Sequence, residues 1–357
     1  MSLTTRQRIA LLGPVLKGIP ELGPLSKREL ADWMRLEFGS VDALDQWIPY
    51  GQNQARVRAP RSIYHLCPGN IVVAGLQSLL AGLLLGSRNI VKLPRDPLMA
   101  AALRKFVKKL PLPLRRTMTF RQAFDAAELR STDAVIAFGR DATMAEIRRQ
   151  LLPHQVLVAY GHKVSFLWLG KVTRADTRLL RSCAWDILLY EQLGCLSPQA
   201  IYLEPGSDLE AFCTGLASAL QYDQGPLPIS LEAASSIRQA RQLAAAAGAR
   251  IWKSAHPLLW TIIADKNPRF TESCGHRVIY VRTASRATLK QVLEPLRGTI
   301  STVGLREPFT KADVQLFWDL EAQRLCPVGR CQDTPFSWHH DGRPQLSDLV
   351  KWVDREG

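Results

Sequence analysis

Cys195 has the clearest capacity for covalent chemistry in this sequence. It lies in Tyr190-Glu-Gln-Leu-Gly-Cys-Leu-Ser-Pro-Gln199, between an apolar helical run and a β-like segment over 200–203. A cysteine at such a boundary can point into a cleft, and a thiolate is the strongest side-chain nucleophile near neutral pH. Unpaired cysteine is also among the most buried residue types, so a packed thiol is the alternative interpretation.

The elements around this cysteine alternate between β and α patterns. Strands are predicted at residues 62–66, 89–93, 134–138, 156–160, 164–169, 200–203, 260–264 and 277–282. Helices are predicted at residues 26–38, 72–85, 98–110, 142–151, 174–190, 209–221, 231–247 and 287–296, and Ser26 with Glu29 fits a capping box. Continuous apolar strands that alternate with helices favour an α/β fold with parallel sheets covered on both faces.

The length of 357 residues suggests two domains, at about 150 residues per domain. We expect residues 1–160 to form a helical N-terminal segment and a first α/β domain. Residues 161–330 then form a second domain that carries Cys195, and residues 331–357 form a tail with a turn and a short helix. The first 60 residues are predicted to be mainly helical.

Composition restricts the class of protein. Apolar residues make up 46% of the chain and charged residues 22%, as in a protein with a packed core. The apolar run 71–86 falls short of the roughly 20 residues that span a bilayer, so a buried helix is predicted there. Residues 1–8 lack the pattern of a secretory signal. We therefore expect a cytoplasmic protein whose seven cysteines are free thiols.

The formal net charge is +14, and much of it is local. Residues 88–121 hold ten Lys or Arg residues against one acid, Asp96. This stretch could bind an anionic ligand, or it could be a solvated helix face around Arg104 and Lys108. No motif that reads nucleic acid accompanies the charge, so we expect no nucleic-acid partner.

Five sequence strings together resemble the LuxC-type acyl-CoA (fatty acyl) reductases of the aldehyde dehydrogenase superfamily. They are His65-Leu-Cys-Pro-Gly-Asn70, Asn89-Ile-Val-Lys-Leu-Pro94, Tyr160-Gly-His-Lys163, Glu191-Gln-Leu-Gly-Cys-Leu-Ser-Pro-Gln199 and Ser337-Trp-His-His-Asp-Gly-Arg343. The chain is about 100 residues shorter than a typical superfamily member. The resemblance implies two Rossmann-like lobes with the active site in the cleft between them.

The resemblance also implies a reaction: a nicotinamide-dependent reduction of an activated acyl group to an aldehyde. Cys195 would accept the acyl group as a thioester, which hydride then reduces. Asn70, with the backbone N–H of Cys195, would stabilise the oxyanion. An N-cap for the following helix is the alternative role of Asn70.

Five residues match positions that hold the cofactor in the superfamily. Lys92 would bind the adenosine ribose, and Gly139 with Arg140 would meet the pyrophosphate. Glu272 would position the nicotinamide ribose. Arg95 stands where NAD-selective members carry a glutamate, and a guanidinium would pair with a 2′-phosphate. NADPH is therefore the expected cofactor, and NADH is the alternative. Arg95 could also simply point to solvent.

The junction at 158–162 departs from hydrolytic aldehyde dehydrogenases, which place a glutamate there to activate water. Val158-Ala-Tyr-Gly-His162 carries no carboxylate, so hydrolysis of an acyl-enzyme is expected to be slow. His162 could act as a base, and a structural role is its alternative. This departure favours a reductase over an aldehyde-oxidising dehydrogenase.

The C-terminal tail is expected to line the mouth of the cleft. Trp338 would form an apolar wall, and His339 or His340 would protonate the aldehyde oxygen, whereas a hydrogen-bonded turn beside Asp341 is the alternative. The pair Cys326 and Cys331 followed by these histidines matches no standard zinc spacing, so no metal is expected.

The sequence therefore predicts an NADPH-dependent reductase of acyl-CoA or of a carrier-bound acyl group. An acyl-transferring protein is a possible partner, and a homo-oligomer is possible. A basic, non-catalytic protein that binds nucleic acid or another anion is the alternative from a different class.

Overall fold

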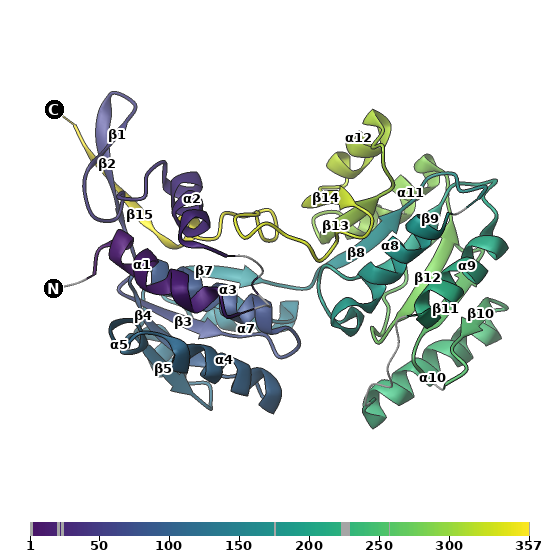
Figure 1. The fold of residues 1–357 in the computed structure, drawn as a ribbon, viewed down its shortest axis with the longest axis horizontal. Helices are drawn as coiled ribbons and strands as arrows, with labels where there is room; N and C mark the ends of the chain where they lie inside the picture. Colours follow the sequence, from purple (N-terminus) through teal and green to yellow (C-terminus); the bar gives the residue numbers. More distant parts are fainter. Residues whose placement is uncertain are drawn as a thin grey trace. The chain divides into compact units, whose positions relative to one another are not determined.

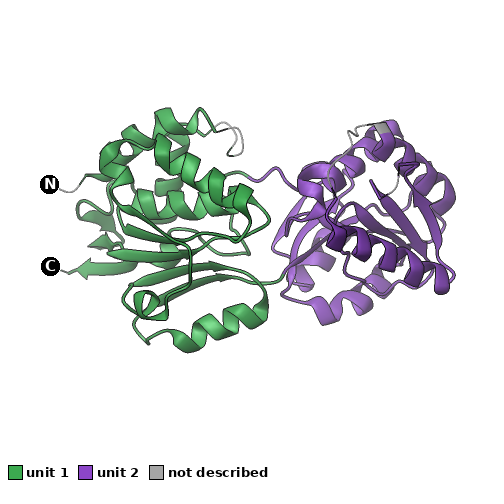
Figure 2. Cartoon of the chain, turned by 90° about the horizontal axis from the view of Figure 1, so that it is seen from below, with its two compact units in different colours: residues 1–162, 335–357 green, residues 163–334 purple. Residues whose placement is uncertain are grey.

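The computed structural model describes residues 3–19, 22, 25–174, 176–222, 229–256 and 258–356. The chain forms two units, of which unit 1 comprises residues 1–162 and 335–357 and unit 2 comprises residues 163–334 (Figure 2). These boundaries lie close to the expected ones at 160/161 and 330/331. The tail belongs to unit 1, where the sequence had suggested a separate segment.

Unit 1 contains a five-stranded sheet in which all strands run parallel (Figure 1). Its strand order is β5 (Met118–Arg121), β4 (Arg88–Lys92), β3 (Ser62–Leu66), β6 (Ala134–Phe138) and β7 (Val156–Tyr160). The chain builds outward from β3 in one direction and from β6 in the other. The expected parallel sheet is therefore confirmed, and its direction of winding changes between β3 and β6.

The helices of unit 1 bury apolar side chains in the clusters around this sheet. They are α1 (Thr5–Leu16), α2 (Lys27–Phe38), α3 (Val72–Leu85), α4 (Pro97–Lys109), α5 (Leu112–Arg115), α6 (Ala126–Arg130) and α7 (Asp141–Gln150). The predicted capping box at Ser26 and Glu29 starts α2. The long apolar run becomes α3, in which every residue from Gly75 to Leu85 is buried. Within the described part of the chain, no helix combines the length and the apolar character that crossing a membrane requires.

A three-stranded antiparallel sheet in unit 1 corrects two sequence predictions. It consists of β1 (Ile48–Tyr50), β2 (Asn53–Arg58) and β15 (Lys351–Arg355), with β2 in the centre. Residues 1–60 are therefore not mainly helical. The tail has only a three-residue 3₁₀ helix at Ser347–Leu349 before β15, in place of the expected short helix. Strand β15 exists because β2 supplies a hydrogen-bonding partner about 300 residues away in sequence.

Unit 2 contains a seven-stranded sheet with one antiparallel edge strand. The strand order is β10 (Arg250–Lys253), β11 (Thr261–Asp265), β12 (Val278–Thr283), β9 (Pro198–Leu203), β8 (Val164–Trp168), β13 (Ile300–Leu305) and β14 (Arg324–Pro327). Only β10 runs antiparallel to its neighbour. The helices are α8 (Thr177–Leu188), α9 (Leu209–Tyr222), α10 (Leu231–Ala246), α11 (Arg286–Leu293) and α12 (Lys311–Asp319).

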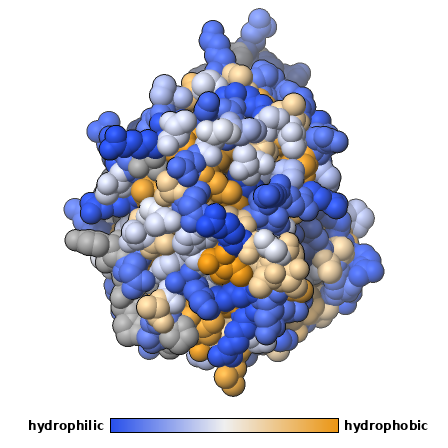
Figure 3. Space-filling view, turned by 90° about the vertical axis from the view of Figure 1, so that its right-hand side faces the viewer, coloured by the Kyte–Doolittle hydropathy of each residue, from blue (hydrophilic) through white to orange (hydrophobic). Residues whose placement is uncertain are grey.

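Apolar clusters lie on both faces of the unit 2 sheet. One includes Ile187, Phe212 and Ile262, and the other includes Phe166, Leu289 and Phe317. Successive side chains of a strand point to opposite faces, so continuous apolar strands supply both clusters. Hydrophilic residues cover most of the face seen in Figure 3. Unit 2 therefore has the covered parallel sheet that the sequence predicts.

Candidate active site

Cys195 lies on a tight turn that leads directly into β9. The N–H of Ser197 donates to the carbonyl of Gly194 over 3.0 Å. The hydroxyl of Ser165 on β8 donates to the carbonyl of Cys195 over 2.6 Å and accepts from the N–H of Thr302 over 3.1 Å. Two central strands of the sheet thus hold the cysteine backbone, and its side chain is half-buried.

Most of the other cysteines are more buried than Cys195. Of the seven cysteines, only Cys195 and Cys274 are partly exposed. Burial raises the pKa of Cys67 and of Cys213 to about 12, and it raises the pKa of Cys183 and Cys274 as well. A thiol that stays protonated is a poor nucleophile. These side chains therefore serve packing, and Cys195 is the cysteine whose location fits a nucleophile.

The segment before Cys195 has an unusual backbone that the sequence did not reveal. Tyr190, Glu191 and Gln192 have φ values of 54°, 56° and 57°, although none is glycine. Left-handed conformations of this kind cost about 1–2 kcal/mol per residue. The Gln192 side chain is buried and donates to the carbonyl of Pro198 over 2.7 Å. The turn therefore depends on specific side-chain contacts for its conformation.

Glu272 lies exposed in the loop between β11 and β12, and this loop contacts the Cys195 turn. The N–H of Ser273 donates to the side chain of Gln199 over 3.0 Å. The N–H of His276 donates to the carbonyl of Glu191 over 2.8 Å. The structure thus ties together the two loops that carry Cys195 and Glu272. That Glu272 contacts a cofactor stays a prediction.

The predicted cofactor residues of unit 1 follow the carboxyl ends of neighbouring parallel strands. Leu66 on β3 pairs with Lys92 on β4 and with Ala137 on β6, so these strands end at one level. Ligands of open α/β sheets bind beyond this edge, where the winding direction changes. Residues Asn70, Lys92, Arg95, Gly139 and Arg140 all lie at or just after these three strand ends.

Asn70 is exposed and lies one residue before the start of the helix that follows it. Ile71, and not Asn70, is the N-cap residue of α3, and Ile71 makes no side-chain capping bond. The structure therefore places the N-cap one residue after the position predicted for it. Lys92 is half-buried. Burial raises the pKa of nearby Cys67, and the positive charge of Lys92 lowers the same pKa by a smaller amount. Arg95 is exposed, which leaves its guanidinium accessible to a ligand.

Gly139 and Arg140 precede α7, and both are exposed. Arg140 is the N-cap of this helix and makes no side-chain capping bond. The sequence missed the next residue, Asp141, whose carboxylate accepts the backbone N–H of His162 over 2.8 Å. A Cβ on Gly161 would lie only 2.5 Å from the same oxygen. A carboxylate thus reaches the 158–162 junction from 20 residues earlier, and it binds the backbone there.

The tail forms a hydrogen-bonded turn whose histidines have different environments. Asp341 and Gly342 both have positive φ, and the N–H of Arg343 donates to the carbonyl of His340 over 3.2 Å. His340 is buried, and its ring stacks on Tyr160 with centroids 4.2 Å apart. His339 is exposed. The turn interpretation is therefore confirmed for His340, whereas proton delivery by His339 stays a prediction.

The cysteines and the histidines of the zinc alternative belong to different units. Cys326 and Cys331 lie in unit 2, with their sulfur atoms 3.9 Å apart, and the two tail histidines belong to unit 1. Among the residues that the structure describes, no group of three or more His, Cys, Asp or Glu side chains is arranged to hold a metal.

The basic stretch 88–121 includes the outer face of α4. This helix buries Leu103, Phe106 and Val107, whereas Lys105 and Lys108 are exposed. The amphipathic pattern accounts for these charges as a solvated helix face. The exposed cations still make this surface attractive to anions.

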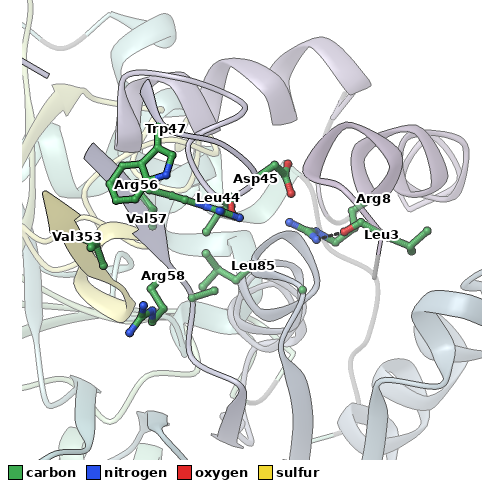
Figure 4. A pocket seen from close by; sticks show the side chains of 12 residues that line it. Leu3, Arg8, Leu44, Asp45, Trp47, Arg56, Val57, Arg58, Leu85 and Val353 are labelled. Atoms are coloured by element: carbon green, nitrogen blue, oxygen red, sulfur yellow. Dashed lines mark hydrogen bonds between the residues drawn. The ribbon is translucent and has the colours of Figure 1, made fainter. Parts of the chain in front are cut away.

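Unit 1 also holds a cavity of about 510 Å³ away from the predicted site residues (Figure 4). Arg8, Asp45, Trp47 and Arg56 contribute to its wall. Arg8 donates to the carbonyl of Leu3, the dashed line in Figure 4. No residue predicted to act in catalysis or cofactor binding lines this cavity, so it is distinct from the candidate active site.

The fold class is defined by two units, each built on a largely parallel sheet, with the candidate nucleophile on the turn just before β9. Lactaldehyde dehydrogenase from Escherichia coli matches 99% of this chain and 87% of its own, with a TM-score of 0.71 at 17% identity. The fold is therefore that of the aldehyde dehydrogenases. The family model described as acyl-CoA reductase (LuxC) matches residues 19–352, and the chain belongs to this family of oxidoreductases.

Proteins described as long-chain acyl-protein thioester reductases are among the relatives of this chain. The protein from Photorhabdus laumondii is 25% identical over 353 residues, which cover 93% of this chain and 71% of that relative. The protein from Vibrio harveyi is 33% identical over 216 residues, which cover 57% of this chain and 45% of that relative. The resemblance inferred from the five strings is therefore confirmed.

Proposed function

We propose that this chain reduces a long-chain acyl thioester to an aldehyde through an acyl group carried on Cys195. The observation that carries the proposal is the position of this thiol. It is half-exposed at the entrance to a central strand, with its carbonyl held by Ser165. Membership of the acyl-CoA reductase family supplies the reaction class.

The covalent step begins when the Cys195 thiolate attacks the acyl carbonyl. The bond from that carbon to the donor sulfur breaks, the donor leaves as a thiolate, and the acyl group remains on Cys195. Hydride addition to this thioester then gives an aldehyde and returns the thiolate. An oxyanion forms when Cys195 attacks and again when hydride adds, and Asn70 with the Cys195 N–H would stabilise it in both steps. His339 would lend a proton to the oxygen of the forming aldehyde and recover it when the Cys195 thiolate leaves.

The donor set in unit 1 fits a nicotinamide dinucleotide. Lys92, Arg95 and Arg140 bring three cationic side chains to one end of the parallel sheet, which suits a pyrophosphate and a further phosphate. Bound at this edge, the cofactor would supply the hydride. The exposed Arg95 favours NADPH, with NADH as the alternative. Glu272 in unit 2 would orient the nicotinamide ribose.

The acyl donor is a thioester of coenzyme A or of a protein. The family description names acyl-CoA, and the two relatives are described as acting on acyl-protein thioesters. Both kinds of donor are commonly acidic, so the exposed cations of 88–121 would speed their approach at low salt. A protein donor would make an acyl-transferring partner part of the reaction.

The test measures NADPH oxidation with a series of acyl-CoA and acyl-protein thioesters, beside the variant Cys195→Ala. Mass spectrometry of the intact chain reports the acyl adduct. We expect thioester-dependent oxidation of NADPH and an adduct on the wild-type chain, with both lost in the variant. Turnover with NADH alone would replace the cofactor assignment and leave the thioester mechanism intact.

Two other results would reject the reductase. Release of free acid in place of aldehyde would mean that water reaches the acyl group, as in an aldehyde-oxidising dehydrogenase. No adduct and no turnover, together with salt-sensitive binding of nucleic acid, would support the basic binding protein.

A further inference from the structure

Two left-handed segments face each other beside the candidate nucleophile. The first is Tyr190–Gln192, and the second is Gly275–Arg277, where φ is 73°, 53° and 61°. Five of these six residues carry side chains that disfavour this conformation. Backbone strain of this kind persists only where surrounding contacts enforce it, and it is concentrated at functional sites.

The contacts that enforce it join one segment to the other. The His276 N–H donates to the Glu191 carbonyl over 2.8 Å. The Arg277 guanidinium donates to the Glu191 carboxylate over 2.6 Å. Gly275 has a φ of 73°, which favours glycine, and a Cβ there would lie 2.8 Å from a terminal methyl carbon of Leu193. The two segments thus pack against each other as one cluster.

The ion pair is the contact in this cluster that a side-chain substitution can remove. The Arg277 side chain is 7% exposed, whereas that of Glu191 is 39% exposed. The Arg277 carbonyl accepts the N–H of Thr261 over 2.9 Å, which fixes the arginine to β11. Glu191 is therefore held from a rigid strand, and the turn that carries Cys195 begins three residues after it.

We propose that Arg277 and Glu191 are a positioning pair, which holds the Cys195 turn against the loop that carries Glu272. The proposal rests on the function proposed above, since it assigns a role in placing the reactive thiol. Neither side chain needs to touch the substrate. Loss of the pair would let segment 190–192 relax toward ordinary backbone conformations and displace the thiol.

The test compares Glu191→Gln with Glu204→Gln. Glu204 pairs with Arg286 over 2.6 Å in the same unit and has no assigned role in the reaction, so it is a matched control. We expect Glu191→Gln to lower kcat by about 10- to 100-fold, because small displacements of reacting groups cost this much. KM should stay within about twofold, since substrate binding surfaces are unchanged. Glu204→Gln should leave kcat within about twofold of wild type.

Hydrogen exchange gives a readout that does not need turnover. Amides of residues 190–197 should exchange about tenfold faster in Glu191→Gln and at the wild-type rate in Glu204→Gln. Arg277→Lys keeps the charge and should retain more activity than Arg277→Gln, with the same order in exchange protection.

The outcomes separate this proposal from the proposed function. Unchanged exchange over 190–197 in Glu191→Gln overturns the positioning pair, whether or not the chain reduces thioesters. Faster exchange with an unchanged kcat also overturns it, and the reductase stands. If the wild-type chain reduces no thioester, the proposed function is rejected. Faster exchange over 190–197 in Glu191→Gln would then still show that the ion pair holds the Cys195 turn in place.

Discussion

Unit 2 holds thiols in two contrasting settings, the Cys195 turn and a buried corner that contains Cys326 and Cys331. Cys195 is half-exposed and follows a strained segment, whereas Cys326 and Cys331 are 4% and 0% exposed. The corner is built around Asp186 on α8, whose carboxylate accepts the N–H groups of Gly329 and Cys331 over 2.6 and 2.9 Å.

The contrast shows that location, and not the type of residue, sets what a cysteine does. In the corner, the hydrogen bond with the Cys326 side chain, followed by burial, raises the pKa of Cys331 well above its ordinary value, and the same hydrogen bond lowers the pKa of Cys326. Burial also raises the pKa of Asp186 to about 6, despite its two backbone hydrogen bonds. Polar groups there satisfy one another and stabilise a chain reversal after β14. At Cys195 the side chain is left partly open to reagents.

Alkylation of native protein should give the largest difference between the two settings. Iodoacetamide should modify Cys195 at least about a thousandfold faster than Cys326 or Cys331, because buried thiols react only after local opening. Peptide mass spectrometry over a time course measures each rate. Cys195→Ser should lack the fast modification at this site and leave the slow ones unchanged. Equal rates at Cys195 and Cys331 would erase the distinction.

Removal of the Asp186 carboxylate should destabilise the corner strongly. Asp186→Ala leaves the buried N–H of Cys331 and the partly buried N–H of Gly329 without an acceptor, at roughly 2 kcal/mol each, so up to about 4 kcal/mol of unfolding free energy should be lost. Asp186→Asn keeps one acceptor oxygen and should lose about half as much. Denaturant unfolding measures both. A loss below about 1 kcal/mol in the alanine variant would mean that water satisfies these groups.

The raised pKa of Asp186 predicts a pH dependence of stability with a definite sign. Between its ordinary pKa of 3.8 and the folded value of about 6, the folded state keeps a proton that the unfolded state has lost. Stability therefore falls as pH rises through this window and levels off above it, by about 3 kcal/mol in total. Unfolding free energies from pH 4 to 7.5 should show this slope in wild type and lose it in Asp186→Asn. Parallel curves would contradict the assignment.

Sequence patterns predicted the sheets well where strands are continuously apolar. Strands β6 and β7, which are continuously apolar, agree with their predicted limits to the residue, as do strand β3 and helix α3. Their apolar runs end at turn-forming residues, so the local signal and the packing agree. Strand β2 reads Asn-Gln-Ala-Arg-Val-Arg and gives little such signal, because it is mostly polar; it pairs with β1 and with β15, which lies far along the chain.

The candidate site was predictable at the level of residue types but not of backbone. The residues around Lys92 lie at the carboxyl ends of parallel strands, where such sheets bind ligands, whereas the Cys195 turn lies before the amino end of β9. The left-handed segment 190–192 contains no glycine and so gives no signal in the sequence. Asp141 was missed because it reaches Gly161 only through the helix–strand packing of α7 and β7.

The smallest effect is expected at Ser165, whose hydroxyl joins the Cys195 carbonyl to Thr302. Ser165→Ala removes one donor to Cys195 and one acceptor for Thr302, both in buried surroundings. We expect a loss of about 1–2 kcal/mol in unfolding free energy. Because Cys195 keeps its left-handed preceding segment, its alkylation rate should change by less than about fivefold. Ser301 precedes Thr302 on β13 and is also buried, so Ser301→Ala controls for the removal of a core hydroxyl. A larger loss of Cys195 reactivity in Ser165→Ala would make this hydroxyl, in place of the Glu191 pair, the contact that fixes the thiol.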